Sequence, residues 1–305
     1  MLFGAALTTG RFIPKRTPIK HQFRLCLNPG NIGVNLDQRG LLDAAVKYGY
    51  RAISPQPSHL MKMSQEERQH LVDDMKSKDI TFGSANLPID FRNDEKTFAE
   101  GLRSLPETCE ILRSVGGTRL NTWIMPTHDH FTYMDNFKKH RDRLKAAGNI
   151  VGHYGIRLGL EYVGPKTLMA RSKFSFIRTM AETKELLAAM GEDNIGFVLD
   201  SFHWYCCDES KADILTLDKD DIVTVDLNDA REGFTRDTQV DGMREMPLAT
   251  GVIPIAEFVR GLAEIGYDGP VRSEPFNQAI RDMEDEAAIQ KNFDLMTEAI
   301  NLAND

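Results

Sequence analysis

The chain has 305 residues, of which 41% are hydrophobic and 27% are charged, and its formal net charge is −8 at pH 7. A chain of this size can bury a large core, and one α/β barrel accounts for the length better than two domains do. The acidic balance disfavours a broad nucleic-acid-binding surface. The four cysteines, Cys26, Cys109, Cys206 and Cys207, form no CxxC pair, which suits a reducing compartment.

Residues 1–20 differ from the rest of the chain. They contain the short apolar run MLFGAALTTGRF, which has no basic residue before it and is too short to span a bilayer. We expect an N-terminal extension, followed by a single domain over residues 21–305, in a cytoplasmic protein. The alternative is the remnant of an export signal whose basic start is missing, which would place the protein in the periplasm.

Strand-like and helical patterns alternate from residue 21 onwards. Apolar runs predict strands at 23–27, 50–54, 80–85, 119–125, 157–163, 195–200, 222–227 and 270–274. Helical patterns begin at the capping box of Ser64 and Glu67 and recur at 95–115, 131–154, 174–190, 255–265 and 282–302. This alternation predicts an α/β fold with eight strand-helix units, a single (β/α)₈ TIM barrel.

Four acidic residues stand where the last four predicted strands end: Glu161 in LGLEYVG, Asp200 in GFVLDSFHW, Asp226 in VTVDLND and Glu274 in VRSEPF. They are 39, 26 and 48 residues apart, close to one strand-helix unit or slightly more, so they fall on successive strands. Buried carboxylates on neighbouring strands repel one another unless a cation pairs with them. The pattern therefore predicts a divalent metal at the C-terminal mouth of the barrel, where barrel enzymes have their active sites.

The motifs LEYVGP, LDSFHWY, VDLND, PLATGVI and GYDGPVRSEPF resemble the xylose-isomerase-like TIM barrels, grouped as sugar phosphate isomerases and epimerases. That group also includes inosose dehydratases and endonuclease IV. The resemblance is clearest between residues 155 and 276. It implies that one divalent ion is bound by four acids: Glu161, Asp200, Asp226 and Glu274.

Many epimerase-like members have His where this chain has Asp226, so the resemblance implies a site made of oxygen ligands alone. Such ligands favour Mn²⁺ or Mg²⁺ over Zn²⁺, and Mn²⁺ is the first choice. The alternative is that one or more of the acids forms a salt bridge at the barrel rim with an arginine: Arg157, Arg231 or Arg272.

Two further residues match the family near these acids. His203 follows Asp200 by three residues, and the family's histidine in this pattern lies beside the metal and touches substrate or a second metal. Arg231 resembles the family's substrate-binding arginine after the seventh strand. The alternatives are a packed aromatic histidine and a solvated loop cation.

The upstream strand ends supply other candidates. His128 is the preferred general base, because a neutral histidine can remove a proton next to a carbonyl, and His59 is a candidate for substrate binding. Surface positions are the alternative for His59 and His130. Trp123, with Phe276, is a candidate apolar wall for a sugar ring. With His128 and His203, two metal ligands complete the catalytic set: Glu161 and Glu274.

The chain departs from two sub-mechanisms of the family. The second glutamate of the ketose 3-epimerases is replaced by Thr167, and the lysine of xylose isomerases by Val163; Lys166 is a substitute proton donor or a surface residue. We expect a metal-dependent isomerase or epimerase acting on a sugar or keto-sugar through an enediolate. The alternatives are a dehydratase or lyase using the same proton abstraction, and a non-catalytic sugar-binding barrel. The expected partner is a small sugar, without nucleic acid or membrane, and a homo-oligomer stays open.

Overall fold

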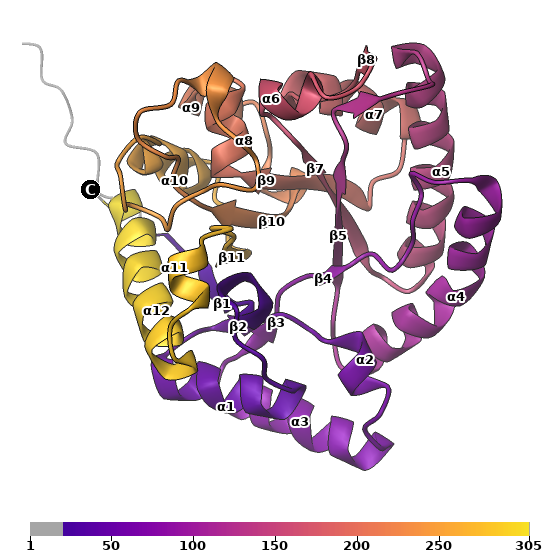
Figure 1. Cartoon of the computed structure of the whole chain (residues 1–305). Helices are drawn as coiled ribbons and strands as arrows, with labels where there is room; N and C mark the ends of the chain where they lie inside the picture. The colour runs from indigo at the N-terminus through magenta and orange to yellow at the C-terminus, as the bar shows by residue number, and fades with distance from the viewer. Residues whose placement is uncertain (1–20, 305) are drawn as a thin grey trace, which may run out of the picture.

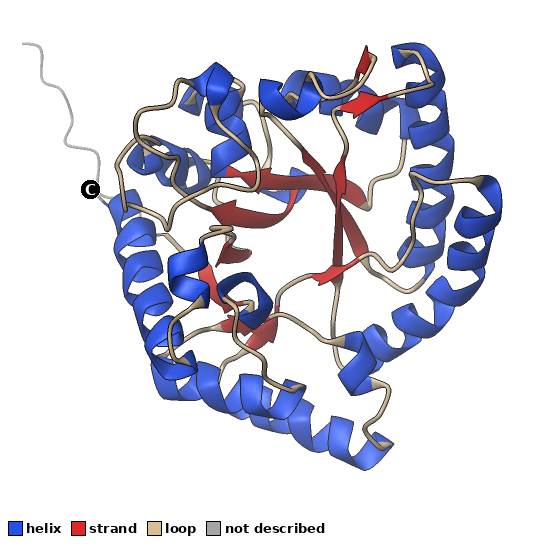
Figure 2. Cartoon of the chain, viewed as in Figure 1, coloured by secondary structure: helices blue, strands red, loops and turns tan. Residues whose placement is uncertain are grey.

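The computed structural model describes residues 21–304, so the predicted N-terminal extension lies outside the described residues. Within that range, nine strands form one curved parallel sheet surrounded by a ring of helices (Figures 1 and 2). The sheet has the order β3-β2-β1-β11-β10-β9-β7-β5-β4. Its strands are β1 (Arg24–Leu27), β2 (Ala52–Ile53), β3 (Thr81–Phe82), β4 (Ala85–Asn86), β5 (Arg119–Ile124), β7 (Arg157–Tyr162), β9 (Ile195–Asp200), β10 (Ile222–Leu227) and β11 (Pro270–Ser273).

The two strands at the ends of that order, β3 and β4, are halves of one predicted strand. β3 pairs with β2 on one side, and β4 pairs with β5 on the other, with only Gly83 and Ser84 between them. A Cβ on Gly83 would lie 2.6 Å from Cys26 Sγ, so a side chain does not fit where the strand divides. The sheet is thereby closed, and the predicted (β/α)₈ barrel is confirmed.

The long helices pack outside the barrel and cover its apolar outer face (Figure 2). They are α1 (Gln38–Tyr48), α3 (Gln65–Ser77), α4 (Glu95–Ser114), α5 (Tyr133–His153), α7 (Met180–Met190), α10 (Ile255–Glu264) and α12 (Asp285–Asn301). Shorter helices lie in the loops: α2 (Pro57–Leu60), α6 (Lys166–Met169), α8 (Ser201–Cys206), α9 (Lys211–Ile214) and α11 (Gln278–Arg281), with the 3₁₀ turns η1 (Pro29–Ile32), η2 (Lys219–Asp221), η3 (Arg236–Thr238) and η4 (Leu302–Asn304).

The helix starts follow local capping chemistry. The predicted capping box of Ser64 and Glu67 is formed at α3, and Thr179 with Glu182 forms a second one at α7. The prediction of a helix from 174 was wrong at its start, because the Thr179 cap begins the helix at Met180. The sequence patterns also missed α1, although the Asp37 side chain caps it by accepting from Gly40 N–H.

A small antiparallel pair, β6 (Thr127–His128) and β8 (Phe174–Ser175), lies outside the main sheet. It ties the loop after β5 to the loop after β7, and it includes the first residues of the predicted helix at 174. His128 is therefore part of an ordered strand pair and not the tip of a free loop. No helix within residues 21–304 combines the length and hydropathy needed to cross a membrane.

Gly196 in β9 provides a test of the barrel's packing. A Cβ there would lie 2.2 Å from the backbone oxygen of Asp221, which cannot move away as a flexible side chain would. We expect Gly196→Ala to lower the free energy of unfolding by about 1–3 kcal/mol, the usual cost of overpacking. Gly242→Ala is the control, because nothing lies within 4 Å of its added Cβ. Urea unfolding of both variants checks this, and equal stabilities would contradict it.

Candidate metal centre and active site

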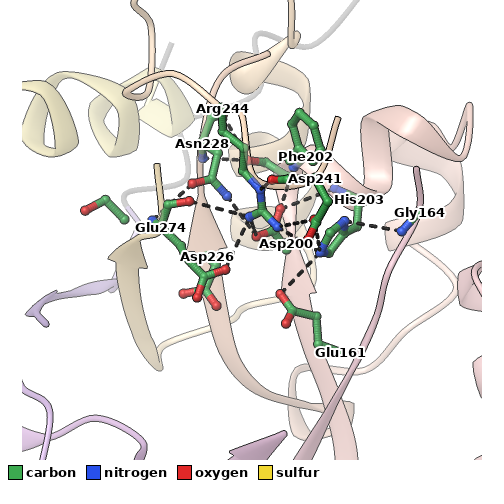
Figure 3. Close-up of polar contacts among 12 residues, drawn as sticks. Glu161, Gly164, Asp200, Phe202, His203, Asp226, Asn228, Asp241, Arg244 and Glu274 are labelled. Atoms are coloured by element: carbon green, nitrogen blue, oxygen red, sulfur yellow. Dashed lines mark hydrogen bonds and ion pairs between the residues drawn. The ribbon is translucent and has the colours of Figure 1, made fainter. Parts of the chain in front are cut away.

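The structure brings the four acidic residues together at the C-terminal mouth of the barrel (Figure 3). One oxygen of each carboxylate lies within 4.8 Å of the others: Glu161, Asp200, Asp226 and Glu274. Strand register explains the convergence, because Asp226 on β10 is opposite Asp200 on β9, and side chains paired across parallel strands point to the same side. The predicted geometry of the cluster is thus present, and occupation by a metal stays a prediction.

One of the four acids is neutralised by a salt bridge. Arg272 on β11 is opposite Asp226 in the parallel register, and its Nε and Nη2 donate to the two Asp226 oxygens at 2.5 and 2.9 Å. Both residues are buried. Of the arginines considered from the sequence, Arg272 is therefore a partner of an acid in the cluster, and this bidentate bond fixes the orientation of the Asp226 carboxylate.

A second arginine, which the sequence patterns missed, lies among the remaining acids. Arg244 is 2% exposed, and its Nη1 donates to Asp200 Oδ2 at 2.8 Å and to Glu274 Oε2 at 3.2 Å. Its Nη2 donates to Asp241 Oδ1 at 2.8 Å. Figure 3 shows its guanidinium group at the centre of these carboxylates. Arg244 comes from a long loop after β10 that has no pattern from which its position could be inferred.

Backbone and amide donors orient the other oxygens of the cluster. Asp200 Oδ1 accepts the N–H groups of Phe202 and His203 at the start of α8, as an N-cap does. Asn228 Nδ2 donates to Asp200 Oδ2 at 2.8 Å, while Asn228 Oδ1 accepts from Glu274 N–H at 3.1 Å. Asn228 therefore ties the ends of two strands together, and it too was missed from the sequence.

Burial and mutual repulsion disfavour the charged form of these carboxylates. Burial, followed by the charge of Glu274, raises the pKa of Glu161 well above its ordinary value. Burial, followed by the charge of Asp226, raises the pKa of Glu274 to about 8. Burial also raises the pKa of Asp200 to about 6, although Arg244 opposes that shift.

The residues present fit a divalent cation. Glu161 Oε1 is buried and has no hydrogen-bond partner, which is costly for a carboxylate oxygen away from water. With Asp241, which also pairs with Arg244, five carboxyl groups share two guanidinium groups, so acidic groups are in excess. A divalent ion ligated by Glu161 would use its Oε1 and offset part of the excess.

His203, a candidate from the family resemblance, lies against this cluster. Its Nδ1 accepts from Gly164 N–H at 3.2 Å, and its Nε2 lies 3.1 Å from Arg244 Nη2 and 3.7 Å from Glu161 Oε1. Burial, followed by the charge of Arg244, lowers the pKa of His203 to about 3, so the ring is neutral. A neutral imidazole has one lone pair for a donor. Gly164 N–H points at Nδ1 and Arg244 Nη2 points at Nε2, so the neutral ring accepts one of these two hydrogens in either tautomer and is held between them.

A cavity of about 510 Å³ opens above the cluster. It is lined by Asn86, Leu87, Arg92, Asn121, Thr122, Trp123, Met125, Glu161, Val163, Leu168, His203, Asp241, Arg244, Glu274 and Phe276. Trp123 and Phe276, the candidates for an apolar wall, are among these residues and are 40% and 45% exposed. This size and mixed lining suit a small polar ligand.

Three candidates from the sequence lie elsewhere. His128 lines a neighbouring cavity, and its Nδ1 accepts from the N–H groups of His130 and Phe131. His59 bonds to Gln56 Oε1 through Nδ1 and lines a third cavity near Arg39. Arg231 is paired with Glu245 at 3.5 Å. Arg244 and Arg92, and not Arg231, are the arginines that line the cavity above the acids.

The chain matches a family model described as a xylose isomerase-like TIM barrel over residues 42–299. It is 23% identical to an inosose isomerase of Halalkalibacterium halodurans over 284 residues, which cover 91% of this chain and 96% of that protein.

Solved structures agree with this match. A xylose isomerase domain protein from Alicyclobacillus acidocaldarius is 26% identical, with a TM-score of 0.81 over 93% of this chain and 100% of its own. The IolI protein, solved with a bound zinc atom, is 22% identical, with a TM-score of 0.76 over 92% of this chain and 98% of its own. Since the family model spans most of the barrel, the chain belongs to the xylose isomerase-like TIM barrel family.

Proposed function

We propose that this protein is a divalent-metal-dependent isomerase or epimerase of a keto-sugar or a cyclic polyol ketone. The observation that carries the proposal is the buried Glu161 Oε1, which has no hydrogen-bond partner and is set in a four-carboxylate cluster at the base of the cavity. The inosose isomerase relative supports a polyhydroxylated ketone as substrate.

Glu161, Asp200, Asp226 and Glu274 are the proposed ligands. When bound, the metal supplies Lewis-acid stabilisation of negative charge on the oxygens of an enediolate. Mn²⁺ or Mg²⁺ suits these oxygen ligands, and zinc is also a candidate because the IolI structure contains it.

The protein's own side chains bind and orient the substrate. Trp123 and Phe276 supply apolar surface for the C–H face of a ring. Arg244 donates to Glu274 and lines the cavity beside His203, so its guanidinium group is placed to hold a hydroxyl or carbonyl oxygen of the substrate.

Proton transfer is assigned to Glu161 and Glu274. These two glutamates were counted as catalytic from the sequence, and both line the cavity, whereas His128 does not. Carboxylates whose pKa is raised by burial are stronger bases than exposed ones. Return of the proton to the same carbon gives an epimer, and return to the neighbouring carbon gives an isomer.

We expect Glu161→Gln and Glu274→Gln to weaken Mn²⁺ binding by roughly 100-fold or more, above the 10–100-fold typical of residues that only support a ligand. The metal-free variants should be no less stable than the wild type, because one repelling charge has been removed. Glu232→Gln, at an exposed loop position, is the control. Calorimetric titration measures the affinities, and full metal occupancy in both variants would refute the ligand set.

The stability of the metal-free protein should fall as pH rises. The folded-state pKa values of Asp200 and Glu274, about 6 and about 8, exceed their ordinary values of 3.8 and 4.5, so the folded state holds more protons than the unfolded state between these limits. The stability that these two groups contribute is fully present below pH 3.8 and is lost as the pH rises through about 6 and about 8.

Saturating Mn²⁺ should oppose this trend, because binding requires deprotonated ligands. Urea unfolding between pH 5 and pH 8, with EDTA or with Mn²⁺, tests both statements. A stability in EDTA that rises with pH over this range would contradict the first of them.

The choice of base can be tested by solvent-deuterium exchange next to the carbonyl of an inosose. Glu161→Asp keeps a carboxylate for the metal but withdraws it by one methylene, so exchange should fall by roughly 100-fold or more, the usual worth of a positioned base. His128→Ala should lower the rate far less. NMR in D₂O at saturating Mn²⁺ measures both rates. A larger loss of exchange in His128→Ala than in Glu161→Asp would show that His128 is the base.

A further inference from the structure

A second cavity, of about 710 Å³, lies beside the barrel mouth at the start of α4 and α5. It is lined by Arg92, Asn93, Asp94, Glu95, Phe98, His128, His130, Phe131, Lys139, Asp142 and Arg143. Arg92 lines this cavity and also the cavity above the carboxylate cluster. A ligand bound at the cluster therefore has Arg92 at the border of its site.

The three acids of this second cavity already have partners. Asp94 caps α4 by accepting from Thr97 N–H and Oγ1. Glu95 is paired with Arg143 at 2.8 Å, and Asp142 with Arg141 at 2.7 Å. These contacts leave the cavity's other two cations, Arg92 and Lys139, to be accounted for.

Arg92 and Lys139 have no carboxylate partner. Within residues 21–304, no carboxylate oxygen lies within the 4.0 Å of an ion pair from the nitrogens of either side chain. Lys139 Nζ donates to the Arg92 carbonyl oxygen at 2.5 Å, which brings the two cations together. Acids act on both cations only from beyond ion-pair distance, among them Asp90 on each of them. Partly buried cations without a direct ion pair are less favourable than the solvated cations of an ordinary surface.

Arg92 is also held rigidly. Its guanidinium group lies between two aromatic rings, 4.3 Å from the Phe91 centroid and 4.0 Å from the Trp123 centroid. Its Nη2 donates to Thr122 Oγ1 at 3.1 Å and to the Trp123 carbonyl oxygen, whereas its buried Nε has no hydrogen-bond partner. An arginine fixed in this way loses little side-chain entropy when an oxyanion binds.

His128 adds a neutral donor to the same cavity. Its Nδ1 accepts two backbone N–H groups, at 3.0 and 2.9 Å, so the neutral ring carries its hydrogen on Nε2. Its pKa is lowered by burial and by the charges of Lys139 and His130. The histidine predicted as the base thus has the hydrogen-bonding state of an anion-binding residue.

We propose that the second cavity binds the anionic group, a phosphate or a carboxylate, of a substrate whose ketone end lies over the carboxylate cluster, with Arg92 and Lys139 as its cationic ligands. This inference rests on the proposed function for the ketone end alone. The two cavities then bind different ends of the substrate. The reacting ketone lies over the acids, and the unreactive anionic group lies beside Arg92 and Lys139.

The test compares three related ketoses that differ at one end: D-fructose, D-fructose 6-phosphate and D-fructuronate. Calorimetric titration gives the affinity of each for the Mn²⁺-loaded protein and for two variants, Arg92→Met and Lys139→Met. Lys138→Met is the control, because Lys138 is exposed on the same helix and does not line the cavity. The ratio of anionic to neutral affinity is the readout, since a general loss of structure would change both together.

We expect at least one anionic ketose to bind roughly tenfold or more tightly than D-fructose, and this ratio to fall by about tenfold in Arg92→Met, as for a lost charge-assisted bond. The ratio should fall in Lys139→Met and stay unchanged in Lys138→Met. A preference for the 6-phosphate identifies a phosphate, and a preference for the fructuronate identifies a carboxylate.

Equal affinity for all three ketoses, or a ratio that Arg92→Met does not change, overturns the proposal. If no ketose binds, inorganic phosphate is titrated in their place. Binding of phosphate that depends on Arg92 then supports the anion site while the proposed function fails, and no such binding overturns the anion site as well. If the protein catalyses proton exchange on a neutral ketone but does not bind the anionic ketoses more tightly, the proposed function is supported and only the anion site is overturned.

Discussion

The structure depends on the burial of four carboxylates at one end of a closed barrel. Their mutual repulsion and the loss of water would each cost several kcal/mol without compensating charge. Two buried arginines supply part of that charge: Arg272 from a neighbouring strand, and Arg244 from a loop. The remainder is the physical reason to expect a cation at Glu161, whose Oε1 has no hydrogen-bond partner within the described residues.

The loop that carries Arg244 is itself held by a buried acid. Asp229 accepts backbone N–H groups from Ala230, Thr250, Gly251 and Ile253, and its backbone pairs with Glu245, the neighbour of Arg244. A long loop of this kind would be mobile without such anchors. The position of Arg244 among the acids is therefore a property of the folded loop.

The mouth of the barrel is electrostatically divided. On one side the acids outnumber their cations, and on the other side Arg92 and Lys139 form no ion pair with a carboxylate of the described residues. Arg92 stacks on Trp123, which lines the first cavity, so the two sides meet at one residue pair. An active site arranged in this way selects a ligand by where its charge lies as well as by its shape.

The sequence by itself determined the alternation of strands and helices and the placement of the acids at strand ends, because both are local patterns. Side chains alternate between the two sides of a strand, and Arg272 is two residues before Glu274, so it points to the same side. The sequence therefore also contained evidence that Arg272 lies beside the acids. The helix α1 was missed and the start of α7 was wrong, since a single cap decides where such helices begin.

Only the tertiary structure decided which loop residues reach the acids. Arg244 lies 44 residues after Asp200 and Arg92 lies 69 residues before Glu161, and no period connects a loop position with a strand end so far away. For the same reason His128, His59 and Arg231 were plausible from sequence but line other cavities or pair elsewhere. Strand ends are fixed by the hydrogen-bond register of the sheet, whereas a loop is positioned by contacts that form only when the whole barrel has closed.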